Sequence, residues 1–205
     1  MKHYTILFLL SLLSYSLYGQ NQYINQVLLL NEGRYDYYEQ EIVEPVSVGV
    51  YNPSTNLYNT IIELDNARFA SDLIIFGDYF YVAADNKVFK YDLNTYELIA
   101  EQDAPGVRKL IIYDNYLFIT KGDYDSATFS SVIFDSYLDI FSASDLSFIM
   151  SFDVSNGPQW STESIIINEN KLYVAINNGY EWGNYKGIVG VVDLLTMDYT
   201  HEVDL

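Results

Sequence analysis

The sequence predicts an all-β fold, a β-propeller of four-stranded antiparallel blades with about four blades present. Four segments repeat one pattern, two β-rich runs around a short polar turn, and their first turn residues, Asn52, Asp92, Ser142 and Asp193, are 40, 50 and 51 residues apart. Many of the runs are continuously apolar, as in 73–76 (LIIF). Such runs are typical of strands buried on both faces, as in stacked propeller blades. No helical period is visible, and a β-sandwich, the main alternative, would not repeat so regularly.

The first 19 residues are typical of a secretory signal peptide. Lys2 supplies the positive charge, 6–13 (ILFLLSLL) the short apolar stretch, and Gly19 the small residue before an expected cleavage at Gln20. The apolar stretch is shorter than the roughly 20 residues that span a bilayer, and a buried N-terminal strand is the alternative. We therefore expect a secreted protein, periplasmic or at the cell surface, with a repeat domain over 20–205 and no second stretch long enough for a membrane anchor.

Each repeat is expected to contain two hairpins, which we call A–B and C–D after the order of their strands. The C–D hairpins begin near Val46, Lys87, Tyr137 and Gly187, and the A–B hairpins of the last three repeats begin near Asp72, Lys109 and Ser164. The expected blades cover about 24–64, 71–101, 107–153 and 163–205.

The first blade is predicted to lack a strand. It offers strands near 27–30, 46–51 and 57–64 but no obvious A strand, and the sequence stops at the end of the fourth D strand. An unclosed propeller exposes strand edges. The chain is therefore expected to be a fragment of a longer propeller, with closure by self-association and a four-bladed ring as the alternatives.

A family resemblance accompanies these repeats. The segment 88–98 (VFKYDLNTYEL) resembles the repeat of YVTN/YncE-type propellers, and 27–33 (VLLLNEG) resembles the first blade of secreted members of Bacteroidetes type. The resemblance covers nearly all of 24–205 and implies a propeller, usually of about seven blades, but it says little about activity. Some surface propellers of this broad family capture small nutrients such as cobalamin, a role that the resemblance permits here.

The lengths of the predicted connections differ between the two ends of the blades. Since strand direction alternates, A–B and C–D turns share one face, while B–C and D–A connections share the other. A–B turns are tight, at 77–78, 114–115 and 169–170. The B–C connections are long in three blades and compact, at 85–86, in the second. The long connections are 31–45, 121–136 and 177–186, and the D–A connections 65–70, 102–107 and 155–161 join them.

The face with the long connections is the predicted binding face, because exposed loops on a rigid scaffold tend to carry binding residues. Tyrosine and tryptophan there offer rigid contact area with a polar group, suited to a flat ligand, a sugar or a protein. The alternative is that these rings pack the loops onto the blade ends. The predicted ligand-binding residues are Arg34, Tyr35, Tyr37, Tyr38, Tyr124, Trp160, Tyr180, Trp182 and Tyr185, and Phe129 lies in the same loops.

Composition argues against several classes of function. Lys and Arg total 10 against 28 Asp and Glu, a formal net charge of -18, so nucleic acid is not an expected partner. The absence of cysteine removes disulfides, thiolate metal sites, a cysteine nucleophile and a lipid-anchored cysteine. His201 is the only histidine left after signal cleavage, which argues against a Ser-His-Asp triad or a multi-histidine metal centre.

The remaining chemistry is sparse, and we predict no catalytic residue, metal ligand or cofactor. Acidic residues are plentiful, but nothing in the sequence pairs two of them as a glycosidase requires. The segment 122–126 (GDYDS) has oxygen ligands of the kind that calcium takes, yet it lacks the rest of an EF-hand loop, and a solvated acidic loop is favoured. The sequence therefore predicts a secreted, non-enzymatic binding module for a small molecule or glycan. A protein-protein interaction scaffold at the cell surface is the second hypothesis, and a carboxylate-dependent hydrolase or lyase the third.

Overall fold

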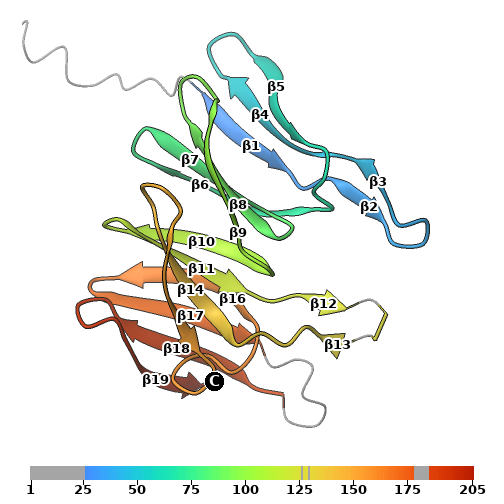
Figure 1. Ribbon diagram of the computed structural model, residues 1–205. Helices are drawn as coiled ribbons and strands as arrows, with labels where there is room; N and C mark the ends of the chain where they lie inside the picture. The colour runs from blue at the N-terminus through green and yellow to red at the C-terminus, as the bar shows by residue number, and fades with distance from the viewer. Residues whose placement is uncertain (1–25, 126, 129, 178–184) are drawn as a thin grey trace, which may run out of the picture.

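The computed structural model describes residues 26–125, 127–128, 130–177 and 185–205. These residues form one three-stranded sheet, three four-stranded sheets and two two-stranded hairpins, and all of the pairings are antiparallel. The four larger sheets, which we call blades 1 to 4, follow one another in chain order as a stack that curves into an arc (Figure 1). No helix capable of crossing a membrane occurs among the residues described.

Blade 1 contains three strands, as predicted. By its position in the repeat β1 is a B strand, and β4 and β5 are the C and D strands; among the described residues no A strand pairs with β1. The hairpin β2–β3 lies in the connection from β1 to β4. The strands are β1 (Val27–Asn31), β2 (Arg34–Asp36), β3 (Glu41–Glu44), β4 (Val46–Asn52) and β5 (Leu57–Leu64).

Blades 2 to 4 each contain an A, B, C and D strand in that order across the sheet. Blade 3 also carries the hairpin β12 (Tyr124–Asp125)–β13 (Ser130–Ser131) between its B and C strands. Blade 2 is β6 (Ala70–Phe76), β7 (Tyr79–Ala84), β8 (Lys87–Asp92) and β9 (Leu98–Asp103). Blade 3 is β10 (Val107–Tyr113), β11 (Tyr116–Lys121), β14 (Ser136–Ser142) and β15 (Phe148–Asp153). Blade 4 is β16 (Thr162–Asn168), β17 (Lys171–Asn177), β18 (Gly187–Asp193) and β19 (Asp198–Asp204).

The core consists of three apolar layers, each between two neighbouring blades. Alternate residues of β7 belong to different layers: Phe80 and Val82 pack toward blade 1, whereas Tyr81 and Ala83 pack toward blade 3. In the third layer, between blades 3 and 4, Phe118 of β11 packs with residues of β17 and β18. A strand buried on both faces needs apolar residues at every position, which explains the continuous runs in the sequence.

The strands that are almost entirely buried on both faces are β7, β11 and β14, which are B and C strands of blades 2 and 3. The run 73–76, which was expected to be buried on both faces, is instead the A strand β6, where Ile75 and Phe76 are exposed; in β16, Ile166 is 62% exposed. By contrast every residue of β14 is buried. An A strand is the inner edge of its sheet and has a neighbouring strand on one side only, so part of its apolar surface faces the axis of the arc.

The C–D turns repeat one geometry, which explains the polar residue that marks each repeat. The Oδ1 atom of Asp92 accepts hydrogen bonds from the backbone N–H groups of Asn94 and Thr95, both at 2.8 Å. These hydrogen bonds lower the pKa of Asp92. Oδ1 of Asn52 and Oδ1 of Asp193 each accept two backbone N–H groups in the same way. In the third turn, the hydroxyl group of Ser142 accepts the backbone N–H of Ser144. Each turn then places one residue in the left-handed conformation: Asn56, Tyr96, Leu146 and Met197.

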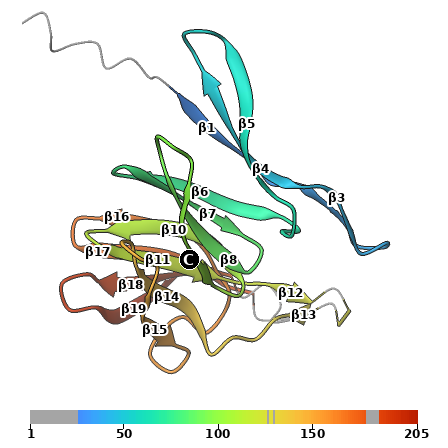
Figure 2. The same cartoon turned by 45° about the horizontal axis from the view of Figure 1, so that its top comes forward.

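The hairpins β2–β3 and β12–β13 extend from the same side of the arc, the side opposite the C–D turns (Figures 1 and 2). They occupy the connections after β1 and β11, where the sequence predicted long B–C connections. Blade 2 makes the same step with the two-residue turn 85–86. We call this side the connection face.

Candidate functional site

A groove of about 550 Å³ lies on the connection face where the inner strands begin. Blade 1 contributes the step from β1 into β2, blade 2 the approach to β6, and blades 3 and 4 the first residues of β10 and β16. The groove therefore forms only when segments from four repeats meet at the axis of the arc. Its lining is Glu32, Gly33, Arg34, Tyr35, Tyr37, Arg68, Phe69, Ala70, Ser71, Arg108, Lys109 and Glu163.

The three inner strands share an irregularity at the groove. The A–B pairing shifts register between Ala70 and Asp72 in blade 2, between Val107 and Leu110 in blade 3, and between Thr162 and Ile165 in blade 4. A β-bulge redirects the side chains of its strand. The bulged positions are Ser71, Arg108 with Lys109, and Glu163 with Ser164, and all but Ser164 line the groove.

Arg68 is held by a carboxylate at the edge of the groove. Its Nε donates to both oxygens of Asp85 at 3.0 Å, and its Nη2 donates to Oδ1 of the same side chain. This hydrogen-bonded pair raises the pKa of Arg68, while partial burial opposes the increase. Asp85 belongs to the compact turn between β7 and β8, so the short connection of blade 2 positions a cation at the groove.

The remaining cations link neighbouring blades. Arg108 of blade 3 donates from Nε to Oε2 of Glu163 in blade 4 at 2.9 Å, and its Nη2 lies 2.9 Å from Oε1. Lys109 reaches back to blade 2, where Nζ donates to the backbone oxygen of Ser71 at 2.7 Å and lies 3.6 Å from Oδ1 of Asp72. Arg34 lies on the β2–β3 hairpin, 3.2 Å from Oε1 of Glu44 across the strand pair.

A smaller hollow of about 200 Å³ adjoins the groove and shares Arg108 and Glu163 with it. The β12–β13 hairpin supplies Tyr124 to this hollow, and Ser161 precedes the inner strand β16. The remaining lining residues are Gly122, Asp123 and Asn177. The Arg108–Glu163 pair therefore lies between two hollows, one bordered by each of the hairpins.

The structure brings together some of the predicted binding residues and separates others. Arg34, Tyr35 and Tyr37 line the groove, and the two tyrosine rings meet edge to face with centroids 5.0 Å apart. Tyr124 lines the smaller hollow. Tyr38, 98% exposed, the half-buried Trp160 and the exposed Tyr185 line neither. Phe129, Tyr180 and Trp182 lie outside the described residues.

Sequence reasoning missed the charged half of the groove, namely Arg68, Arg108, Lys109 and Glu163. A signal was present: the chain has only three arginines, and two of them fall at or just before the start of a predicted A strand. Both of these positions belong to the face already chosen for its aromatic residues. The aromatic count concealed them, because each arginine stands alone in its repeat and only the fold places the repeats side by side.

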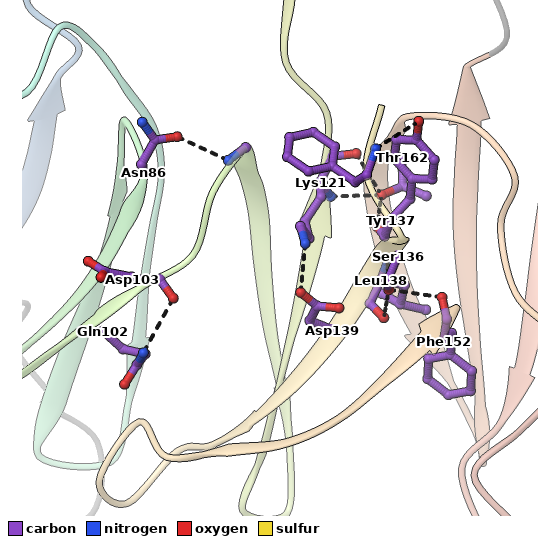
Figure 3. A network of polar contacts seen from close by, with 12 residues as sticks. Asn86, Gln102, Asp103, Lys121, Ser136, Tyr137, Leu138, Asp139, Phe152 and Thr162 are labelled. Carbon is purple, nitrogen blue, oxygen red and sulfur yellow. Dashed lines mark hydrogen bonds and ion pairs between the residues drawn. The ribbon is translucent and has the colours of Figure 1, made fainter. Parts of the chain in front are cut away.

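The base of the β12–β13 hairpin is fixed by a buried ion pair (Figure 3). Nζ of Lys121 lies 2.9 Å from Oδ2 of Asp139, and each side chain is only 10% exposed. The ring of Phe134 covers this ammonium group at 4.9 Å and also contacts Gly106. The backbone N–H of Lys121 donates to Oγ1 of Thr162 in blade 4 at 2.9 Å. The hairpin that carries Tyr124 is thereby anchored within blade 3 and to blade 4.

The calcium hypothesis for 122–126 finds no support in the described part of that loop. Oδ1 of Asp125 accepts the backbone N–H groups of Ala127 and Thr128, which lowers the pKa of Asp125, and Oδ1 of Asp123 accepts the N–H of Tyr124. These carboxylates cap turns. Among the residues that the structure describes, no group of three or more acidic or histidine side chains is arranged to hold a metal ion. His201 lies exposed in the outer strand β19.

Comparison with known proteins identifies the fold. No protein-family model matches the chain, and no curated protein sequence matches it. Among solved structures it is similar to hydrazine synthase of Kuenenia stuttgartiensis (TM-score 0.60, 12% identity, 78% of this chain and 43% of that one). It is also similar to BamB of Moraxella catarrhalis (0.55, 14%, 86% and 54%) and to the Pan2 WD40 domain of Neurospora crassa (0.52, 10%, 85% and 48%).

These similarities, together with the repeated four-stranded blades, establish a partial β-propeller. The chain spans about half the length of the structures that it matches. At identities of 10 to 14% they define the fold and not the function. The function must therefore be argued from the groove.

Proposed function

We propose that the protein is a secreted, non-enzymatic propeller module that binds a small molecule or a glycan in the groove of the connection face. The observation that carries the proposal is the groove itself, in which the Tyr35–Tyr37 pair faces charged side chains from three other repeats. Its volume of about 550 Å³ falls in the range of about 300 to 1,000 Å³ typical of ligand sites. Tyrosine rings offer flat apolar area for stacking, and the charged groups orient a polar ligand.

The groove has the rigidity that a binding site needs. The ion pair between blades 3 and 4, the lysine bridge between blades 2 and 3, and the buried Lys121–Asp139 pair each tie a lining segment to the stacked sheets. Side chains held by such supporting contacts lose little conformational freedom when a ligand binds. Binding residues on bulged strands are also more rigid than residues on free loops.

The geometry favours binding over catalysis. Glu163 has both carboxylate oxygens engaged by Arg108, so neither oxygen is placed to exchange a proton with a ligand. Asp85 is engaged in the same way by Arg68. A hydrolase in this groove would have to use Glu32, the other lining carboxylate, or release Glu163 or Asp85 from its arginine.

Two adjacent tyrosines allow a matched test. Tyr37 lines the groove, whereas Tyr38 does not, although both lie on the tip of the same hairpin. A binding screen of glycans and metabolites first identifies the best-bound compound, and calorimetry then measures its affinity for each variant. Tyr37→Ala is expected to lower this affinity about tenfold, since an aromatic side chain that stacks on a nucleic-acid base contributes on the order of 1–3 kcal/mol. Tyr38→Ala should bind normally. Equal affinity of both variants and the unaltered protein would contradict the proposal.

A protein-protein interaction scaffold remains the second candidate function. The observation in its favour is the exposure of Tyr38 and Tyr185 away from the groove, because tyrosine is enriched at protein interfaces. A protein partner that is lost with Tyr38→Ala but not with Tyr37→Ala would support the scaffold. Secretion is tested separately by sequencing the mature N-terminus, which is expected to begin at Gln20.

A further inference from the structure

The three arginines of the chain, Arg34, Arg68 and Arg108, all line the groove, together with Lys109. The chain carries only 10 basic residues against 28 acidic ones, so this gathering runs against the overall charge. The acidic side chains that line the groove are Glu32 and Glu163. Four cationic side chains therefore gather at one groove of an acidic protein, and each lies beside a carboxylate: Glu44, Asp85, Glu163 or Asp72.

The two inner arginines are oriented by their partners in the same manner. Asp85 and Glu163 each occupy the Nε side of a guanidinium group, accepting from Nε and contacting Nη2. Within the described residues, no hydrogen bond is made by Nη1 of Arg68 or of Arg108. A guanidinium group has five N–H donors in a planar fork, so a carboxylate on one side leaves the other side able to bind an oxyanion.

The pairs leave part of each guanidinium group open at the groove. The side chains of Arg68 and Arg108 are 32% and 39% exposed, although each is held by a carboxylate. Oriented guanidinium groups beside a hollow are a common means of recognising carboxylate and phosphate groups. The bulges of β6 and β10 bring Ser71, Arg108 and Lys109 to the same wall.

We propose that the groove holds an oxyanion of its ligand, a carboxylate or a phosphate group, between Arg68, Arg108 and Lys109, with Arg34 closing from the β2–β3 hairpin. This inference rests on the proposed function, since it assigns a charge to the ligand of the same groove. The tyrosine pair would contact the uncharged part of that ligand. An acidic sugar or a phosphorylated small molecule combines the two chemistries.

The test uses the whole chain and three probes: trigalacturonate for a carboxylated sugar, inorganic phosphate for a free phosphate, and maltotriose as the uncharged sugar. Calorimetry at low salt is expected to show binding of at least one anionic probe and weaker or no binding of maltotriose. The affinity for the anion should fall as salt is added, because the contact is electrostatic. Trigalacturonate binding without phosphate binding would identify a carboxylate as the recognised group. Phosphate binding without trigalacturonate binding would identify a phosphate group.

Variants separate the guanidinium groups from net charge. Arg68→Gln is expected to lower the affinity for the anion about tenfold or more, since each hydrogen bond to a charged group contributes strongly. The double variant Arg108→Gln with Glu163→Gln leaves the net charge unchanged and no carboxylate unpaired, and it should lower the affinity for the anion to a similar extent. Lys171→Gln, which removes an exposed cation at the start of β17, is the matched control and should bind normally. Circular dichroism checks that each variant is folded.

The outcomes distinguish this inference from the function on which it rests. If none of the three probes binds, or if the arginine variants bind the anion as the unaltered protein does, the oxyanion site is wrong. In the second case, loss of affinity with Tyr37→Ala would show that the groove still binds its ligand through the aromatic pair alone. If neither the arginine nor the tyrosine variants change the affinity, the groove is not the site, and both proposals fail.

Discussion

The two faces of the blade stack differ in how regular they are. On the side with the A–B and C–D turns, which we call the turn face, every C–D turn repeats one geometry, with an Asn, Asp or Ser capping the backbone and one residue in the left-handed conformation. On the connection face, the connections of blades 1 to 3 are not alike: blades 1 and 3 carry hairpins, and blade 2 turns in two residues. Repetition on one face specifies the scaffold, and variation on the other builds the groove.

The difference shows where a repeat protein is able to acquire function. A turn that must recur in every blade leaves little room for chemistry, since its polar residue is already engaged by the backbone. A connection carries no such duty, and its side chains meet those of other repeats at the axis. The predictions below test whether the two faces respond differently to substitution, from the largest expected effect to the smallest.

The largest effect is expected at the base of the connection face. Replacing Lys121 by Ala leaves Asp139 buried without its counter-charge, and breaking a buried pair costs on the order of 3–5 kcal/mol. Oδ1 of Asp139 already has no hydrogen-bond partner among the described residues, so little else is available to compensate. Urea unfolding followed by circular dichroism measures the loss. The double variant Lys121→Met with Asp139→Leu should recover most of it, and equal destabilisation of both proteins would contradict the role of the pair.

Two glycines provide the next comparison, because both have positive φ, +75° for Gly106 and +59° for Gly77. A Cβ on Gly106 would meet the ring of Phe134 at 2.5 Å, whereas a Cβ on Gly77 would meet no atom within 4 Å. Gly106→Ala is therefore expected to destabilise the connection face by about 1–2 kcal/mol for the backbone and about 1–3 kcal/mol for the clash.

The matched substitution Gly77→Ala on the turn face should show only the backbone part of this effect. Gly77→Asn should be close to neutral, since the equivalent residues Asp114 and Glu169 adopt the same conformation without being glycine. Thermal unfolding of the three variants decides the point. A loss at Gly77→Ala as large as at Gly106→Ala would show that the two faces do not differ.

The smallest effect concerns pH and the turn face. Hydrogen bonds from Ser147 lower the pKa of Asp145 to about 2, from an ordinary value of 3.8. A carboxylate with a depressed pKa stabilises the fold above its unfolded pKa, and this contribution disappears as the pH falls toward the folded value. The melting temperature of the unaltered protein should therefore exceed that of Asp145→Asn above about pH 4, and the gap should close toward pH 2. A gap that is independent of pH would contradict the assignment.

Much of the scaffold was predictable from particular residues. The markers Asn52, Asp92, Ser142 and Asp193 predicted the turns because each caps its own turn, a local interaction that sequence spacing reveals. The A–B turn at 77–78 and the three-stranded first blade followed from the same patterns. The expectation that the run 73–76 is buried on both faces was wrong, because an apolar run does not show whether a strand has one neighbouring strand or two.

The groove was predictable only in part. Tyr35 and Tyr37 were found through the length of their connection, and Arg34 through its position beside them. Arg68, Arg108 and Glu163 were missed, since no local pattern joins a residue of one repeat to a residue of another. The bulges that bring Arg108 and Glu163 to the groove wall are also invisible in sequence, because they arise from how each inner strand pairs with its neighbour.

By itself, the sequence determined the repeat, the antiparallel blades and the face with the long connections. These features depend on interactions within one blade, between residues that are close in the chain. Only the tertiary structure decided that the three arginines share one groove, that Glu163 orients Arg108, and that Tyr37 lines the groove whereas Tyr38 does not. The physical reason is that these are contacts between blades, whose positions follow from the packing of apolar layers and not from the order of residues.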